Sequence, residues 1–185
     1  MKARLKVMLL SALGAIACFT AVTYTSCNND KCKAIVCAFG GTCNDGVCTC
    51  PTGYEGPQCE KVMRDKFLGV YQVQEKGTVS ETAQYTVSVE PGTEVTDLRI
   101  KNFRNIFLEE VSAYVRVDTV IIPEQTVDER WKVSGIGVIQ SDKYYGANGR
   151  LVLRYSVRDL DLPETSPADD YGMNAGSPSI WNKTP

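Results

Sequence analysis

The chain has no histidine among its 185 residues, and this absence excludes several kinds of chemistry. Serine–histidine and cysteine–histidine catalytic pairs and imidazole metal sites all need that side chain. Positive charge is also scarce beyond the N-terminal segment: residues 27–185 hold 17 Lys and Arg against 22 Asp and Glu, a net of −5. Because nucleic-acid binding depends on a concentrated basic surface, we expect no nucleic-acid partner.

Cysteine is absent from the 98 residues between Lys61 and Arg158 but dense just before them. The 33 residues 28–60 are fewer than the roughly 40 that usually suffice for an unaided core. Disulfides can stabilise such a segment, and they persist only in oxidising compartments. The sequence alone leaves the pairing of the six cysteines open. They are Cys32, Cys37, Cys43, Cys48, Cys50 and Cys59.

The spacing C-x4-C-x5-C-x4-C-x-C-x8-C, closed by Gly53–Cys59, resembles an epidermal-growth-factor-like (EGF-like) module. Asn44–Gly46 places turn-forming residues where such a module needs a tight hairpin. The resemblance assigns residues 27–60 to one small domain. It implies that the first cysteine pairs with the third, the second with the fourth and the fifth with the sixth, which gives Cys32–Cys43, Cys37–Cys48 and Cys50–Cys59.

We expect no metal and no other cofactor. Zinc sites made of thiolates usually show paired C-x2-4-C knuckles, which this chain lacks. Calcium-binding EGF-like modules carry an acidic or amide residue directly before the first cysteine, whereas Lys31 stands there and adds positive charge.

Residues 1–26 read as an export signal. Lys2, Arg4 and Lys6 precede an apolar run from Val7 to Val22, which a short polar stretch follows. The run is short for a spanning helix of about 20 residues, although a retained signal anchor is an alternative.

Ser26-Cys27 at the end of this segment resembles the lipobox of bacterial lipoproteins. That resemblance implies lipid on Cys27 and attachment to the outer membrane of a Gram-negative cell envelope. Cys18 is a rival lipidation site, and a free or intermolecularly bonded thiol at Cys27 is the other alternative. Cleavage at Cys18 would leave apolar residues directly after the anchor, which favours Cys27.

Residues 61–158 alternate apolar and polar side chains with a period of two, which is typical of strands. About seven strands separated by turn residues predict an antiparallel sandwich or an up-and-down barrel. Gly135 and Gly137 lie two apart within one strand, as at a barrel corner, and favour the barrel. Residues 159–185 are rich in proline and acidic residues and read as a flexible tail.

The order of motifs in residues 61–158 is similar to that of Gram-negative lipoprotein domains expected to form a calycin-like (lipocalin-like) barrel. The similarity includes the opening Phe67–Val73, the strand around Val133–Gly137 and the closing Leu153–Val157. It implies an all-β protein in which a disulfide-stapled EGF-like module precedes a calycin-like β-barrel. It implies fold more than function.

No catalytic constellation stands out, so we do not expect an enzyme. The acidic pairs Glu109-Glu110 and Asp169-Asp170 read as solvated charge, and a carboxylate-based hydrolase is the minor alternative. We expect a membrane-anchored binding module whose partner is a protein, a glycan or a small apolar ligand. Carriage of a small apolar ligand inside the barrel is the main alternative. Candidate ligand contacts are the aromatic residues Tyr114, Trp131, Tyr144 and Tyr145.

Overall fold

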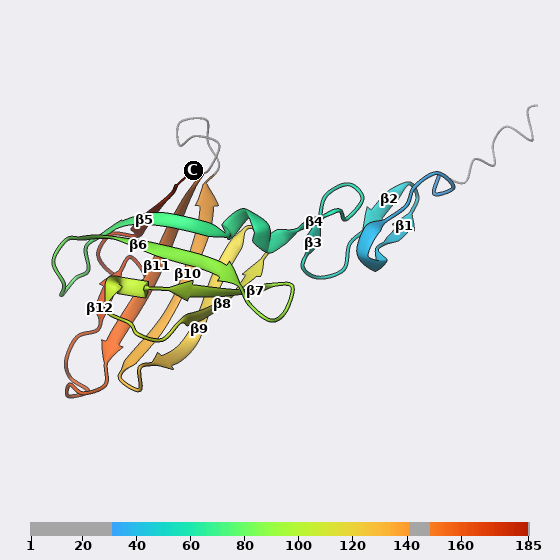
Figure 1. The fold of residues 1–185 in the computed structure, drawn as a ribbon. Helices are drawn as coiled ribbons and strands as arrows, with labels where there is room; N and C mark the ends of the chain where they lie inside the picture. The colour runs from blue at the N-terminus through green and yellow to red at the C-terminus, as the bar shows by residue number, and fades with distance from the viewer. Residues whose placement is uncertain (1–30, 141–148, 185) are drawn as a thin grey trace, which may run out of the picture.

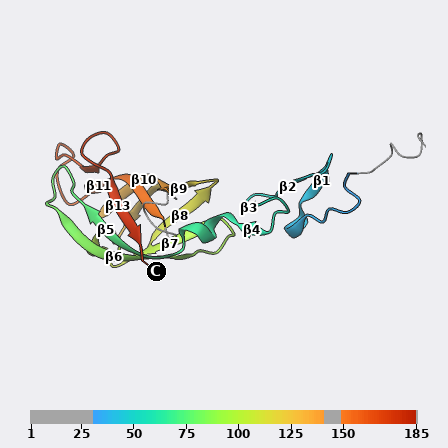
Figure 2. The same ribbon diagram turned by 90° about the horizontal axis from the view of Figure 1, so that it is seen from above.

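The computed structural model describes residues 31–140 and 149–184. Within these ranges the regular structure is mostly β, arranged as a small disulfide-stapled module and a closed barrel (Figures 1 and 2). Both views place the module beyond one end of the barrel rather than against its side wall. The signal segment, Cys18, Cys27, Tyr144 and Tyr145 lie outside the described residues.

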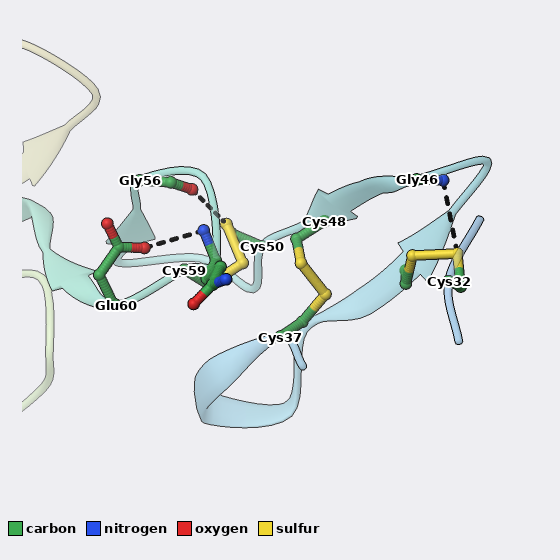
Figure 3. The surroundings of a disulfide bond; sticks show 10 residues. Cys32, Cys37, Gly46, Cys48, Cys50, Gly56, Cys59 and Glu60 are labelled. Atoms are coloured by element: carbon green, nitrogen blue, oxygen red, sulfur yellow. Dashed lines mark hydrogen bonds between the residues drawn. A yellow bond between two sulfur atoms is a disulfide. The ribbon is translucent and has the colours of Figure 1, made fainter. Parts of the chain in front are cut away.

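The module is built from two small antiparallel pairs held by three disulfides (Figure 3). A 3-10 turn, η1 (Ala38–Gly40), precedes a hairpin of β1 (Thr42–Asn44) and β2 (Val47–Thr49), and β3 (Tyr54–Glu55) pairs with β4 (Lys61–Val62). Asp45 and Gly46 turn the hairpin with positive φ angles, as the turn residues predict. The disulfides are the three that the EGF-like spacing implied: Cys32–Cys43, Cys37–Cys48 and Cys50–Cys59.

The barrel is an antiparallel meander, as the alternation predicted: from β5 to β11 each strand pairs with the next, and β13 lies between β11 and β5 and closes the sheet. A short 3-10 turn, η2 (Met63–Phe67), leads into it, and η3 (Phe103–Asn105) joins two of its strands. The strands are β5 (Gly69–Glu75), β6 (Ala83–Pro91), β7 (Asp97–Lys101), β8 (Val111–Arg116), β9 (Thr119–Val127), β10 (Trp131–Gln140), β11 (Arg150–Asp159), β12 (Asp169–Tyr171) and β13 (Ser179–Lys183).

The expectation of a flexible tail over residues 159–185 is wrong. One edge of β11 pairs with β10 along its full length, so β12 and β13 both lie on its other edge. β13 also pairs with β5 and thereby closes the barrel. Trp181 of β13 is fully buried, and burial of so large an apolar side chain holds the segment in place. β12 and β13 together take the place of the eighth strand. The sequence pattern did not predict this strand, because residues 172–178 interrupt its alternation.

Gly135 and Gly137 lie where side chains of β11 crowd against β10, as expected for a barrel corner. A Cβ atom at Gly135 would lie 2.6 Å from the Cβ of Tyr155, closer than packed carbon atoms allow. The pairing of β10 with β9 shifts register beside Gly135, between Val133 and Gly135. Glycine therefore lets the sheet bend here and leaves room for the Cβ of Tyr155 and the adjoining backbone.

The interior of the barrel is occupied by the inward-facing half of each alternating strand. Phe103 lies at the centre of an aromatic group, with its ring centroid 4.9 Å from that of Tyr155 and 5.9 Å from that of Trp181. Tyr71 packs beside Trp181 with centroids 6.0 Å apart. Aromatic side chains of this size supply much of the apolar burial that stabilises the closed sheet.

The two ends of the barrel differ. At the module end, Lys66 forms salt bridges with Glu55 of the module, at 2.9 Å, and with Asp118 of the β8–β9 turn, at 2.5 Å. Gly53 of the module approaches the β6–β7 turn so closely that a Cβ would lie 2.4 Å from Val95. We call the other end the distal end. It consists of residues 76–82, 102–110 and 128–130, which connect strands there, and residues 159–170, which run from the last residue of β11 into β12.

Candidate binding site at the distal end of the barrel

The structure separates the sequence-predicted aromatic contacts. Tyr114 is 39% exposed on the outer face of β8, in a groove of about 280 Å³ that Arg99 and Pro123 also line. It therefore does not line the mouth of the barrel, because its buried neighbours Ala113 and Val115 take the inward positions. Trp131 lies at the distal end, and Tyr144 and Tyr145 lie outside the described residues.

Trp131 is part of a distal pocket of about 220 Å³. The pocket draws side chains from three separate connections and from the ends of β10, β11 and β12, which only the closed barrel brings together. Its walls are mainly apolar and its base carries one buried ion pair. The residues that define it are Val79, Arg104, Ile106, Trp131, Leu162 and Asp169.

Arg104 is turned into this pocket by an unusual backbone. Asn102, Arg104 and Asn105 all have left-handed φ angles, of 59°, 55° and 56°, which non-glycine residues seldom adopt. The intervening Phe103 is thereby buried in the core while the Arg104 side chain, 11% exposed, reaches Asp169. Clustered backbone strain of this kind is typical of functional loops.

Arg104 and Asp169 form a salt bridge of 2.8 Å at the base of the pocket. Asp169 also accepts hydrogen bonds from the backbone N–H groups of Val79 and Ser80, at 2.9 and 3.3 Å, and from the Tyr171 hydroxyl at 3.0 Å. Burial opposes ionisation of Asp169, but these hydrogen bonds outweigh it and lower its pKa below the ordinary value. The carboxylate therefore fastens the β5–β6 connection to β12.

The guanidinium of Arg104 lies near two aromatic rings. It lies 5.4 Å from the Tyr171 ring centroid and 6.0 Å from that of Trp131. Among the described residues, the bond from its Nη2 to Asp169 is its one hydrogen bond to a side chain, so other N–H donors remain for a ligand. Burial lowers the pKa of Arg104, but the electrostatic effects of Tyr171, Tyr155 and Asp169 raise it by more. The pKa of Arg104 therefore lies above its ordinary value.

Trp131 itself is held in place by two neighbouring side chains. Its ring stacks on Phe107 with centroids 5.9 Å apart, and the Arg130 guanidinium lies 4.6 Å from its centroid. Arg130 in turn makes a two-pronged salt bridge to Asp159, at 2.9 and 2.5 Å. Such a fixed, partly exposed indole is suited to contact a ligand without losing conformational entropy.

A second polar network, which the sequence did not reveal, lies beneath the pocket. The buried Glu75 accepts hydrogen bonds from Tyr85 at 2.7 Å, Tyr155 at 2.8 Å and Ser179 at 2.5 Å. The Trp181 indole N–H donates to Ser179 at 2.8 Å. One feature of the sequence could have indicated this network: Glu75 falls on the same face of its strand as the apolar Tyr71 and Val73, which places it in the core.

The acidic pairs of the sequence have structural partners. Asp170 accepts backbone hydrogen bonds from Met173 and Asn174, at 2.7 and 3.2 Å, and so caps the turn between β12 and β13. Glu110 lies among Arg99 and Lys101 on the outside of β7. In the described ranges, the acidic and cysteine side chains form no cluster of three or more that could hold a metal ion.

Together these features define a two-part all-β protein with a disulfide-stapled module at one end of a closed eight-stranded antiparallel barrel. No known protein-family model matches the chain. Across residues 31–140 and 149–184, none of the helical segments has the length and apolar character needed to cross a bilayer.

Proposed function

We propose that this protein is a lipid-anchored lipoprotein of a Gram-negative outer membrane, and that it binds its partner, without catalysis, at the distal end of a calycin-like barrel. The observation that carries the proposal is the distal pocket, where Arg104 and Trp131 lie among exposed apolar side chains. Concave apolar sites with a few convergent polar groups are the usual form of a binding site. Its lining residues lie at the end of the barrel opposite the strand ends that contact the module.

In this proposal the EGF-like module is a spacer next to the membrane. Only four residues separate Cys27 from Cys32, the first bridged cysteine, so a lipid on Cys27 keeps the module close to the bilayer. One acyl chain binds weakly, whereas two or three form a durable tether at about 0.8 kcal/mol per buried CH₂. The salt bridges of Lys66 then orient the barrel with its distal end away from the lipid.

The packed interior of the barrel favours binding at the distal surface over carriage of a ligand inside the barrel. The largest buried side chains, Trp181, Tyr71, Tyr155 and Phe103, point into the space that a carried molecule would need. Their mutual contacts, at centroid separations of 4.9 to 6.0 Å, are those of a packed core.

Anchoring is tested by fractionating cells that produce Cys27→Ala. We expect this variant to leave the membrane fraction, while Cys18→Ala stays in it. If Cys27→Ala remains bound to membranes, the anchoring half of the proposal is wrong.

Binding is tested by native mass spectrometry of the full chain extracted gently from the envelope. We expect an added mass that the distal variant Ile106→Ser/Leu162→Ser loses. The matched control Ile136→Ser/Val138→Ser, which changes exposed positions on the outer wall of β10, should keep it. A bare mass for all three proteins contradicts the binding function, and a small apolar molecule retained by all three would instead favour carriage inside the barrel.

A further inference from the structure

The negative charge of the protein is concentrated at the distal end of the barrel. Residues 76–82, 102–110, 128–130 and 159–170 contain ten acidic and three basic residues, a net of −7, although the whole chain carries only −2. The connections at the module end that the structure describes, residues 61–68, 92–96 and 117–118, contain three basic and three acidic residues and are neutral. The barrel is therefore strongly polarised along its axis.

Local salt bridges pair only some of the acidic residues at the distal end. Asp169 pairs with Arg104, Asp159 and Asp161 pair with Arg130, and Glu110 pairs with residues of β7. Six acidic residues of the distal end have no salt bridge to any residue that the structure describes. They are Glu81, Glu109, Asp128, Glu129, Glu164 and Asp170.

The same end also exposes aliphatic side chains to an unusual degree. Leu108 is 95% exposed, although it is flanked by the buried Phe107 and could have been polar at no cost to the core. Four further aliphatic residues from three connections join it. The exposed set, which we call the distal rim, is Val79, Ile106, Leu108, Leu160 and Leu162. Three of these five also line the distal pocket.

We infer that the partner at the distal rim is a polypeptide segment that combines basic with aliphatic side chains. This inference rests on the proposed function, because it names the partner of the same surface. An exposed apolar patch bordered by polar residues is typical of a protein-interaction site. The surplus of −7 attracts a basic segment, speeds its encounter and repels acidic competitors.

The distal pocket and the acidic residues around it contact different parts of the segment. A pocket of about 220 Å³ accommodates one aliphatic side chain rather than a lipid chain, so it serves as the anchor for the segment. The carboxylates surrounding it then contact the basic side chains on either flank. An anionic lipid surface or an anionic glycan meets repulsion at this end and does not fit it.

The test is a binding measurement on the immobilised full chain with two synthetic peptides. One peptide combines lysine with leucine, and the other has glutamate at each lysine position. We expect the lysine peptide to bind, and its dissociation constant to rise with salt concentration. Glu81→Lys/Glu129→Lys/Glu164→Lys should weaken binding about tenfold, and Leu108→Ser/Leu162→Ser by a similar factor. Glu94→Lys, in the β6–β7 turn at the module end, and Ile136→Ser/Val138→Ser, on the outer wall of β10, lie away from the distal end and should leave binding unchanged.

The inference is overturned if the glutamate peptide binds as tightly as the lysine peptide, or if the distal variants bind like the wild type. Binding of phosphatidylglycerol vesicles that Leu108→Ser/Leu162→Ser abolishes would also overturn it in favour of a lipid surface. These outcomes differ from failure of the proposed function. If native mass spectrometry still shows an added mass that depends on Ile106 and Leu162, the distal surface binds a partner of another chemistry.

Discussion

Ser179 of the last strand donates a hydrogen bond of 2.5 Å to Glu75 of the first, beside the pairing that closes the barrel. Tyr85 and Tyr155 donate to the same carboxylate, at 2.7 and 2.8 Å. One buried acidic side chain therefore connects strands from four places in the sequence. A carboxylate buried among three hydroxyl donors is stable only while all of them remain in place.

Glu75→Ala should destabilise the barrel by about 2–4 kcal/mol, because it leaves three buried hydroxyls without their acceptor. Glu75→Gln keeps an acceptor oxygen and should cost less. Urea denaturation followed by tryptophan fluorescence measures the stability of both variants. If Glu75→Ala were as stable as wild type, the hydrogen bonds to Glu75 would not stabilise the closure between β13 and β5.

Trp181→Ala should cost about 3–5 kcal/mol, because Trp181 is fully buried and contacts both Tyr71 and Phe103. The neighbouring Asn182→Ala is the control, since Asn182 is exposed and should change stability by no more than about 0.5 kcal/mol. Thermal unfolding followed by circular dichroism compares the two. Similar melting temperatures would mean that β13 does not close the barrel in solution.

Reduction of the disulfides should unfold the module and leave the barrel intact. All six bridged cysteines lie in the module, whereas both tryptophans, Trp131 and Trp181, lie in the barrel. Removing a native disulfide typically lowers the folding stability of a small domain by about 2–5 kcal/mol. A segment of this size has too small a core to remain folded after that loss. With a reducing agent, limited proteolysis should cut within residues 31–60 while the fluorescence-detected urea midpoint stays unchanged. A shifted midpoint would contradict the independence of the barrel.

Asp169 should make the barrel sensitive to acid. Its folded pKa is lowered, so its contribution to stability is fully present above the unfolded pKa of about 3.9 and is lost as pH falls through the folded pKa. Below that range the salt bridge to Arg104 is gone. Denaturation at a series of pH values should show a smaller loss of stability in acid for Asp169→Asn than for wild type. Parallel pH profiles would contradict this role.

The sequence made most of the fold predictable, because strands with one buried face alternate with a period of two. β8 shows how far that reasoning extends: Ala113 and Val115 are inward, and the same alternation already placed Tyr114 outside. Our choice of Tyr114 as a candidate ligand contact followed its aromatic character, and its outward position leaves it on the outer wall instead of at the distal pocket. The disulfide pairs came from the EGF-like resemblance, not from the spacing alone.

The site itself was much less predictable. Arg104 reaches the pocket only because Asn102, Arg104 and Asn105 adopt left-handed backbone conformations that no local pattern announces. Its partner Asp169 is 65 residues away, in a segment whose prolines suggested disorder. The pairing of Glu75 with Ser179, 104 residues apart, depends on closure of the barrel and has no local signature.

The central claim is that the distal end binds the partner while the module end faces the membrane. Photo-crosslinking in intact producing cells tests it most directly, with a photoreactive residue in place of Leu162 at the distal rim or of Val138 on the outer wall of β10. We predict a discrete crosslinked product at position 162 and none at position 138. A product at position 138 alone, or equal products at both positions, would contradict the claim.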